Sequence, residues 1–118
     1  MGRVEVTIAV GDPQGNHFEE LEVLVDTGAT FTKVPRELLE KLEVPVERSA
    51  LSELANGRTV SRDIGLITIR LEGQELLTPV IFGEQGERPL LGVIALEDAL
   101  LDVDATHGRL APTNALLL

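Results

Sequence analysis

Apolar and polar residues alternate along several short stretches of the chain, which is the pattern of half-buried β-strands. Valine and isoleucine occupy every second position over residues 4–10, and residues 18–25 form a second such stretch. Between them, residues 11–16 are dense in glycine, proline, aspartate and asparagine, which favour turns. The pattern therefore predicts a β-hairpin that begins at residue 4 and ends at residue 25.

The middle of the chain predicts one short helix and a second hairpin. Leucines within residues 36–42, directly after Pro35, lie on one side of a helix. Asn56-Gly57 predicts a tight turn in which both residues adopt a positive φ, flanked by residues 49–55 and 58–71. Because these flanks are small and polar near the turn, we expect a mobile hairpin with little apolar anchorage.

The last third of the chain continues the strand pattern. Residues 67–71 alternate, residues 76–82 predict another strand, and residues 83–89 form a polar loop. A second helix is predicted over residues 93–101, and strands 101–104 and 108–111 flank a turn before the apolar end at 115–118. The sequence thus predicts an all-β, or mainly β, fold with one or two short helices.

Composition limits the size and the chemistry of the protein. The chain has 118 residues, which suits a single domain spanning residues 1–118. Only 3% of the residues are aromatic against 43% hydrophobic, so the core must consist mainly of leucine, valine and isoleucine. There is no cysteine, which excludes disulfides and thiolate metal sites.

The charge balance disfavours whole classes of partner. A formal net charge of -10 opposes nucleic-acid binding, which needs basic surface. No apolar run approaches the roughly 20 residues of a membrane span, and the N-terminal stretch lacks the apolar block of a signal peptide. We therefore expect a cytoplasmic protein without membrane contact. His17 and His107 each adjoin a turn-forming residue, so we interpret them as turn residues and predict no metal site.

The stretch with the clearest chemistry is residues 24–30, which read Leu-Val-Asp-Thr-Gly-Ala-Thr. An apolar strand here delivers the carboxylate of Asp26 into a tight turn of small residues. Gly28 lets the backbone bend sharply, and Thr27 offers a hydroxyl that can both donate and accept. A lone aspartate after a strand is usually a turn residue or a helix cap, but this longer pattern is much narrower. It resembles the active-site loop of the retroviral-type, single-domain (retropepsin-like) aspartic proteases.

The resemblance extends along most of the chain and implies a set of site residues. In that family a mobile hairpin closes over the substrate as a flap, and a second apolar-apolar-Gly signature before a helix packs under the aspartate loop. Many viral members carry a second aspartate where this chain has Thr30, which can hydrogen-bond but offers no charge. The implied residues are Asp26 as the catalytic group, Thr27, Gly28, Ala29 and Thr30 in its loop, Ala55, Asn56 and Gly57 in the flap, and Leu90, Leu91 and Gly92 as support.

The chain contains this motif once, which bears on its assembly. Asp63-Ile64-Gly65 lacks the hydroxyl residue, and residues 104–106 lack the glycine. Hydrolysis by a carboxylate pair needs one ionised and one protonated group, so the second must come from another copy. The resemblance therefore implies a C2 homodimer in which Thr27 hydrogen-bonds across the axis.

The resulting hypothesis is an aspartic endopeptidase that acts on peptide or protein substrates with no metal or organic cofactor. Two alternatives stay open. One is a non-catalytic peptide-binding or assembly module that keeps the retropepsin-like fold. The other is an unrelated β domain in which Asp26 is only a strand-end turn residue. The distance between Asp26 carboxylates across a two-fold axis separates the hypothesis from the first alternative, and the packing of Leu91 and Gly92 bears on the second.

Overall fold

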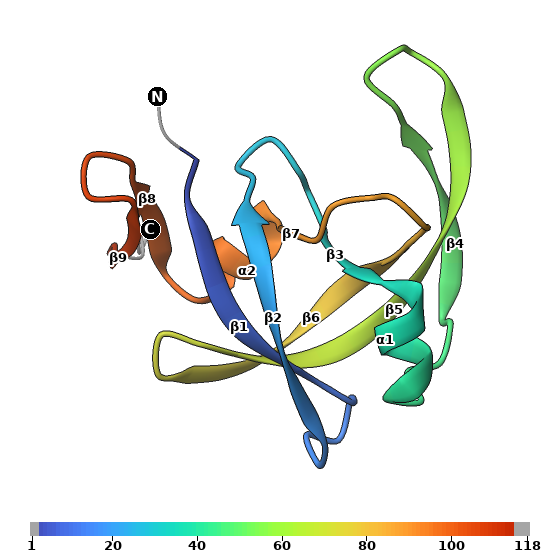
Figure 1. The fold of residues 1–118 in the computed structure, drawn as a ribbon, viewed down its shortest axis with the longest axis horizontal. Coiled ribbons are helices and arrows are strands. Elements are labelled where there is room, and N and C mark those ends of the chain that lie inside the picture. The colour runs from blue at the N-terminus through green and yellow to red at the C-terminus, as the bar shows by residue number, and fades with distance from the viewer. Residues whose placement is uncertain (1–2, 115–118) are drawn as a thin grey trace.

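A computed structural model of the chain describes residues 3–114. Strands dominate it and two short helices interrupt them, so the mainly β prediction is confirmed (Figure 1). The elements are β1 (Glu5–Gly11), β2 (Phe18–Val25), β3 (Thr32–Pro35), α1 (Arg36–Lys41), β4 (Arg48–Glu53), β5 (Thr59–Leu71), β6 (Gln74–Gly83), β7 (Leu90–Leu91), α2 (Val93–Asp98), β8 (Leu101–Asp104) and β9 (Arg109–Pro112).

Seven of the strands form one sheet that closes on itself. Their order is β1-β2-β7-β3-β6-β5-β4, and β1 also pairs with β5, with Val10 opposite Ile69. The predicted first hairpin is present, with β1 and β2 antiparallel from Glu5 opposite Leu24 to Gly11 opposite Phe18. The β4–β5 hairpin extends beyond the closed part of the sheet, while β8 and β9 form a separate two-stranded sheet (Figure 1).

The core is built almost entirely from aliphatic side chains, as the composition requires. Phe82 is the one aromatic residue that is fully buried among residues 3–114. α1 contributes the buried Leu39, and α2 contributes Ala95 and Leu96. Burying such side chains against the sheet supplies most of the favourable free energy of folding. The largest fully buried side chains of the core are those of Phe82, Ile8, Leu39, Ile67, Ile69 and Leu91.

The turn at the tip of the β4–β5 hairpin differs from the two-residue turn that the sequence predicts. Of the pair Asn56-Gly57, only Gly57 has a positive φ, at 83°. Leu54 N–H donates to the carbonyl of Arg58 at 2.7 Å, and Gly57 N–H donates to that of Leu54 at 2.9 Å. This is a three-residue loop with a glycine bulge, which is a common alternative for strands of this twist. The Asn56 side chain caps the loop by accepting from Arg58 N–H at 3.0 Å.

The structure differs from the sequence prediction at two further places. The sequence pattern does not predict β3, because its four residues include a lysine and a proline and show little alternation. The second helix ends at Asp98, not at residue 101, since Leu100 adopts a left-handed φ of 55° and Leu101 already begins β8. The apolar end predicted at residues 115–118 lies outside the described residues.

The short strand β7 joins the two halves of the sheet. It runs parallel to β2, with Leu24 opposite Leu90 and Val25 opposite Leu91. Gly92 follows β7 directly and packs against the backbone of Phe31 and Thr32, where the chain enters β3. A Cβ atom at Gly92 would lie 2.4 Å from the carbonyl carbon of Phe31 and 2.5 Å from its oxygen, which no real contact allows. Only glycine fits at this crossing.

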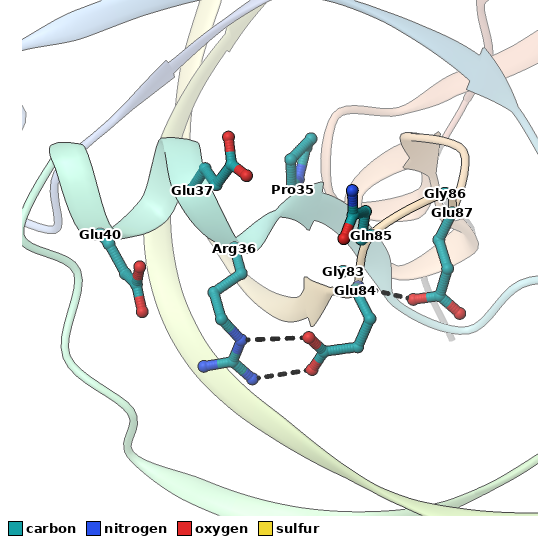
Figure 2. Close-up of a pocket in the computed structure, with 9 residues that line it drawn as sticks. All are labelled: Pro35, Arg36, Glu37, Glu40, Gly83, Glu84, Gln85, Gly86 and Glu87. Atoms are coloured by element: carbon teal, nitrogen blue, oxygen red, sulfur yellow. Dashed lines mark hydrogen bonds and ion pairs between the residues drawn. The ribbon is translucent and has the colours of Figure 1, made fainter.

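Ion pairs connect the base of the β4–β5 hairpin to the loop at residues 84–89. Nη2 of Arg36 lies 2.9 Å from Oδ2 of Asp63 on β5 and 3.0 Å from Oε2 of Glu84 in the loop. Figure 2 shows the guanidinium and the Glu84 carboxylate facing one another as a two-bonded pair. Arg62 of β5 donates to both oxygens of Glu87, at 2.7 and 2.5 Å.

These pairs change the acidity of the carboxylates. The hydrogen bond from Arg36, helped by the Ser49 hydroxyl, holds the pKa of Asp63 below its usual value of 3.8. Burial raises the pKa of Glu87, but its hydrogen bonds from Arg62 and from Glu84 N–H outweigh burial and leave it lowered. Both groups therefore favour the folded state while they are ionised.

We expect Gly92→Ala to destabilise the fold by about 2–3 kcal/mol, because the added methyl group has to displace backbone. Gly108→Ala is the control: a Cβ there meets nothing within 4 Å, so only the strain of its φ of 64° remains, about 1 kcal/mol. Urea unfolding followed by circular dichroism measures both. Equal losses in the two variants would contradict the crowding at Gly92.

We expect Asp63→Asn to lower stability at neutral pH and to lose that deficit in acid. The folded pKa of Asp63 is depressed, so its stabilisation is present above the unfolded pKa near 4 and disappears as the pH falls through the lower folded value. Urea midpoints of wild type and variant, taken from about pH 7 to about pH 2, should therefore converge. A constant difference over this range would mean that the ionised form contributes nothing.

Candidate active site

The backbone of Asp26 is fixed from both sides. It follows the last residue of β2, and its N–H donates to the carbonyl of Leu91 on β7 at 3.0 Å. Its own carbonyl accepts from Ala29 N–H at 3.1 Å, which closes the turn. The preceding residue, Val25, donates to the carbonyl of Val4 at 2.8 Å. Asp26 therefore leaves the sheet in a direction that the strands determine.

The side chain of Asp26 points into the turn of its own loop. Oδ1 accepts from Gly28 N–H at 2.9 Å. A Cβ atom at Gly28 would lie 3.3 Å from the same oxygen, closer than nearly all ordinary contacts, so a small residue is favoured there. Asp26 is half-buried, whereas Thr27, Gly28 and Thr30 are exposed. The loop thus holds a carboxylate in place while leaving its surroundings open.

The supporting signature at residues 90–92 lies directly against this loop. Val93 N–H, at the start of α2, donates to the carbonyl of Ala29 at 2.8 Å, and Ile94 N–H donates to that of Thr30 at 3.2 Å. Gly92 N–H donates to the hydroxyl of Thr32 at 3.1 Å. The structure therefore brings together the two stretches that the sequence singled out, which lie more than sixty positions apart.

Thr32 is a supporting residue that sequence reasoning missed. Its side chain is 1% exposed, and its hydroxyl is a buried polar group that Gly92 N–H satisfies. The available signal was a hydroxyl residue two positions after Thr30. Because the sequence pattern did not predict the short strand β3, it could not indicate that this position faces the interior. An unpaired hydroxyl at such a depth would be costly.

A cleft opens beside the Asp26 loop. Its volume is about 380 Å³, and its walls come from the loop, from β3, β6 and β7, and from strand β4 of the hairpin. Leu51 on β4 is 77% exposed and gives this wall of the cleft an apolar side chain. The lining residues are Gly28, Ala29, Thr30, Phe31, Lys33, Leu51, Ser52, Glu53, Ile81 and Leu90.

The predicted flap residues occupy a different place from the cleft walls. Ala55, Asn56 and Gly57 are exposed at the hairpin tip, which projects beyond the body of the sheet (Figure 1). In this single copy the cleft is bordered by the neighbouring residues 51–53 of the same hairpin. Their role in covering a substrate stays a prediction.

A second hollow adjoins the loop on the side of Thr27. It has a volume of about 460 Å³ and lies between α2 and the start of β8. Leu100, at the left-handed position after α2, is 44% exposed at its edge. This hollow is lined by Thr27, Val93, Leu96, Glu97, Leu100, Leu101, Asp102, Thr113 and Asn114. The Asp26 loop thus separates two hollows, one lined by residues from Gly28 onward and the other by Thr27.

A third pocket lies between α1 and the 84–89 loop, away from Asp26. It has a volume of about 350 Å³ and is lined by four glutamates, with Arg36 and Glu84 paired at its edge (Figure 2). Among residues 3–114 no group of three or more histidine, cysteine or carboxylate side chains is arranged to hold a metal ion. His107 sits in the β8–β9 turn, where Nδ1 lies 2.8 Å from Asp104. In the same described part of the chain, no helix is long and apolar enough to cross a membrane.

Comparisons with known proteins agree with this arrangement. A family model described as "gag-polyprotein putative aspartyl protease" matches residues 14–98. The structure of EIAV protease complexed with the inhibitor HBY-793 resembles this fold with a TM-score of 0.62 and 20% sequence identity, covering 83% of this chain and 88% of that one. No curated protein sequence matches the chain.

The structural likeness establishes the fold, since it extends over most of both chains at low sequence identity. The retropepsin-like prediction is therefore confirmed at the level of the fold. The family model covers well over half of the chain and includes the Asp26 loop, the hairpin and residues 90–92. The chain belongs to this family of retroviral-type aspartic proteases.

Proposed function

We propose that the protein is an aspartic endopeptidase whose catalytic carboxylates are Asp26 and its counterpart in a second copy. The observation that carries the proposal is the placement of Asp26: its backbone is pinned to β7, its carboxylate is partly open to solvent, and its loop borders a cleft of about 380 Å³. A cleft of this size suits a few side chains of an extended peptide.

The reaction requires two carboxylates in different protonation states. Two such groups about 3 Å apart share one proton, because both cannot ionise comfortably. The ionised group takes a proton from a water molecule as the water attacks the peptide carbonyl carbon. The protonated group donates its proton to the carbonyl oxygen, and the C–N bond breaks as the leaving nitrogen receives a proton.

A second copy is needed because the sequence contains a single Asp-Thr-Gly. A two-fold axis beside the Asp26 loop would bring the two loops together, and C2 is the commonest oligomer symmetry. Thr27 is exposed on the side of the loop where the second hollow begins, so its hydroxyl is accessible to an approaching copy. The same approach would leave the cleft at Gly28 to Phe31 free for substrate.

Asp26→Asn should abolish peptide hydrolysis while the protein stays folded and dimeric. Asparagine keeps the size of the side chain and can still accept from Gly28 N–H, but it cannot ionise. A peptide library digested with wild type and variant, analysed by mass spectrometry, gives the result.

Asp98→Asn is the matched control, because Asp98 is exposed at the end of α2 and the same charge is removed. Activity of Asp26→Asn above about a tenth of wild type would rule out the carboxylate mechanism, since losing a catalytic acid–base group costs about a hundredfold or more. Peptide binding without cleavage by the wild type would favour the non-catalytic module.

Thr27→Val should weaken the dimer more than the monomer fold. The change keeps the shape but removes the hydroxyl, and an unpaired partner at the interface costs about 1–3 kcal/mol in dimerisation free energy. Sedimentation velocity at falling protein concentration measures the dissociation constant. Thr30→Val is the control. It removes an exposed hydroxyl from the same loop, but Thr30 lines the cleft, so the dissociation constant should stay unchanged. Identical constants for wild type and Thr27→Val would argue against contact across the axis.

A further inference from the structure

The floor of the cleft beside the Asp26 loop contains a lysine. Lys33 lies in β3 where that strand meets both of its neighbours, opposite Leu90 of β7 and Ile81 of β6. All three residues line the cleft. Because strands flank it on both sides, the side chain of Lys33 starts from a fixed position in the sheet.

The ammonium group of Lys33 is only weakly paired. Its ion pair with Oε2 of Glu87 spans 3.9 Å, which exceeds the range of a hydrogen bond. Glu87 is already occupied by Arg62, which donates to both oxygens, and by Glu84 N–H at 2.7 Å. Lys33 therefore interacts with Glu87 only by charge attraction at a distance, and its ammonium retains donors for another acceptor.

The surroundings of Lys33 make a free cation costly unless an anion joins it. The side chain is 20% exposed, so the ammonium has lost part of its hydration. Phe31, Leu51 and Ile81 give the cleft apolar walls. An aspartate or glutamate side chain entering here would place its methylene groups against these walls and its carboxylate at the ammonium.

We propose that Lys33 is a specificity-determining residue, and that this cleft selects a substrate with an aspartate or glutamate side chain. The proposal rests on the proposed function in that it takes this cleft as the peptide site. In a chain of net charge -10, Lys33 is the one basic residue among the described residues that line this cleft, where its ammonium can attract an anionic side chain. Selection follows because a neutral side chain would leave Lys33 with only its long ion pair to Glu87, and a basic side chain would be repelled by the ammonium.

Glu53 is the group that could oppose this preference. It lines the same cleft from the end of β4, where it is exposed on the hairpin. If Glu53 reached Lys33, the two charges would cancel and an acidic side chain would gain nothing. Lys33 is fixed within the sheet and Glu53 is solvated at its edge, so Lys33 dominates the floor of the cleft.

The test is an affinity selection that needs no catalysis. A mass-coded octapeptide library with glutamate, glutamine or lysine at each position in turn is passed over immobilised Asp26→Asn protein, and the retained peptides are quantified by mass spectrometry. We expect glutamate to exceed glutamine by about three- to five-fold at one position, or at two if both halves of a dimer contribute. Lysine should be depleted at that position.

Three variants in the same Asp26→Asn background assign the effect. Lys33→Met should abolish the preference for glutamate, and Lys33→Glu should reverse it toward lysine. Lys41→Met is the matched control: it removes the same charge from α1, where Lys41 is 65% exposed and paired with Glu19 at 3.3 Å, and it should retain the full preference. Urea unfolding of each variant confirms that the fold is intact.

The outcomes separate this proposal from the proposed function. A glutamate preference that survives Lys33→Met, a preference for lysine in the parent protein, or no enrichment at any position overturns the role of Lys33. Digestion of the same library by wild type tests catalysis independently. Cleavage that depends on Asp26 without a Lys33-dependent preference overturns only the specificity. Lys33-dependent enrichment without cleavage supports the specificity and overturns the protease function.

Discussion

The hydrogen bond from Asp26 N–H to the carbonyl of Leu91 is the contact on which the candidate site depends. It exists because β7, only two residues long, runs parallel to β2 between the two halves of the sheet. The crossing is so close that a single methyl group at Gly92 would collide with the backbone at Phe31. The carboxylate is therefore positioned by backbone packing, which gives it a fixed direction at little entropic cost.

In the dimer that we propose, each copy supplies half of the site. The Asp26 loop has a substrate-sized cleft lined from Gly28 onward and a second hollow that begins at Thr27. One residue of sequence therefore separates the surface proposed for the substrate from the surface proposed for the partner. The proposed assembly and the proposed catalysis would therefore be coupled, because moving the loop for one would disturb the other.

Several ion pairs of this acidic protein gather between α1, the base of the β4–β5 hairpin and the 84–89 loop. Arg36 pairs with both Asp63 and Glu84, and Arg62 pairs with Glu87, so these ion pairs join the base of the hairpin to the 84–89 loop. The hairpin that supplies one wall of the cleft is thereby tied to the loop that precedes β7. Lys33 lies at the inner end of this group of ion pairs, at 3.9 Å from a glutamate already bound elsewhere. Because this distance is too long for a hydrogen bond, the donors of its ammonium remain open to the acidic side chain that we propose for the cleft.

The sequence by itself determined the first hairpin, the two short helices, the Asp26 loop and the glycine signature at residues 90–92, because these depend on local periodicity and on residues with special backbone freedom. Only the tertiary structure decided what β3 does, since its four residues gain their stability from β6 and β7, far away along the chain. For the same reason Thr32 and Lys33 escaped sequence reasoning. The former is buried under Gly92 and the latter lies on the floor of the cleft, and neither environment is encoded by its immediate neighbours. The pairing of strands that lie far apart in the sequence determines which side chains meet, and the local sequence pattern does not predict that pairing.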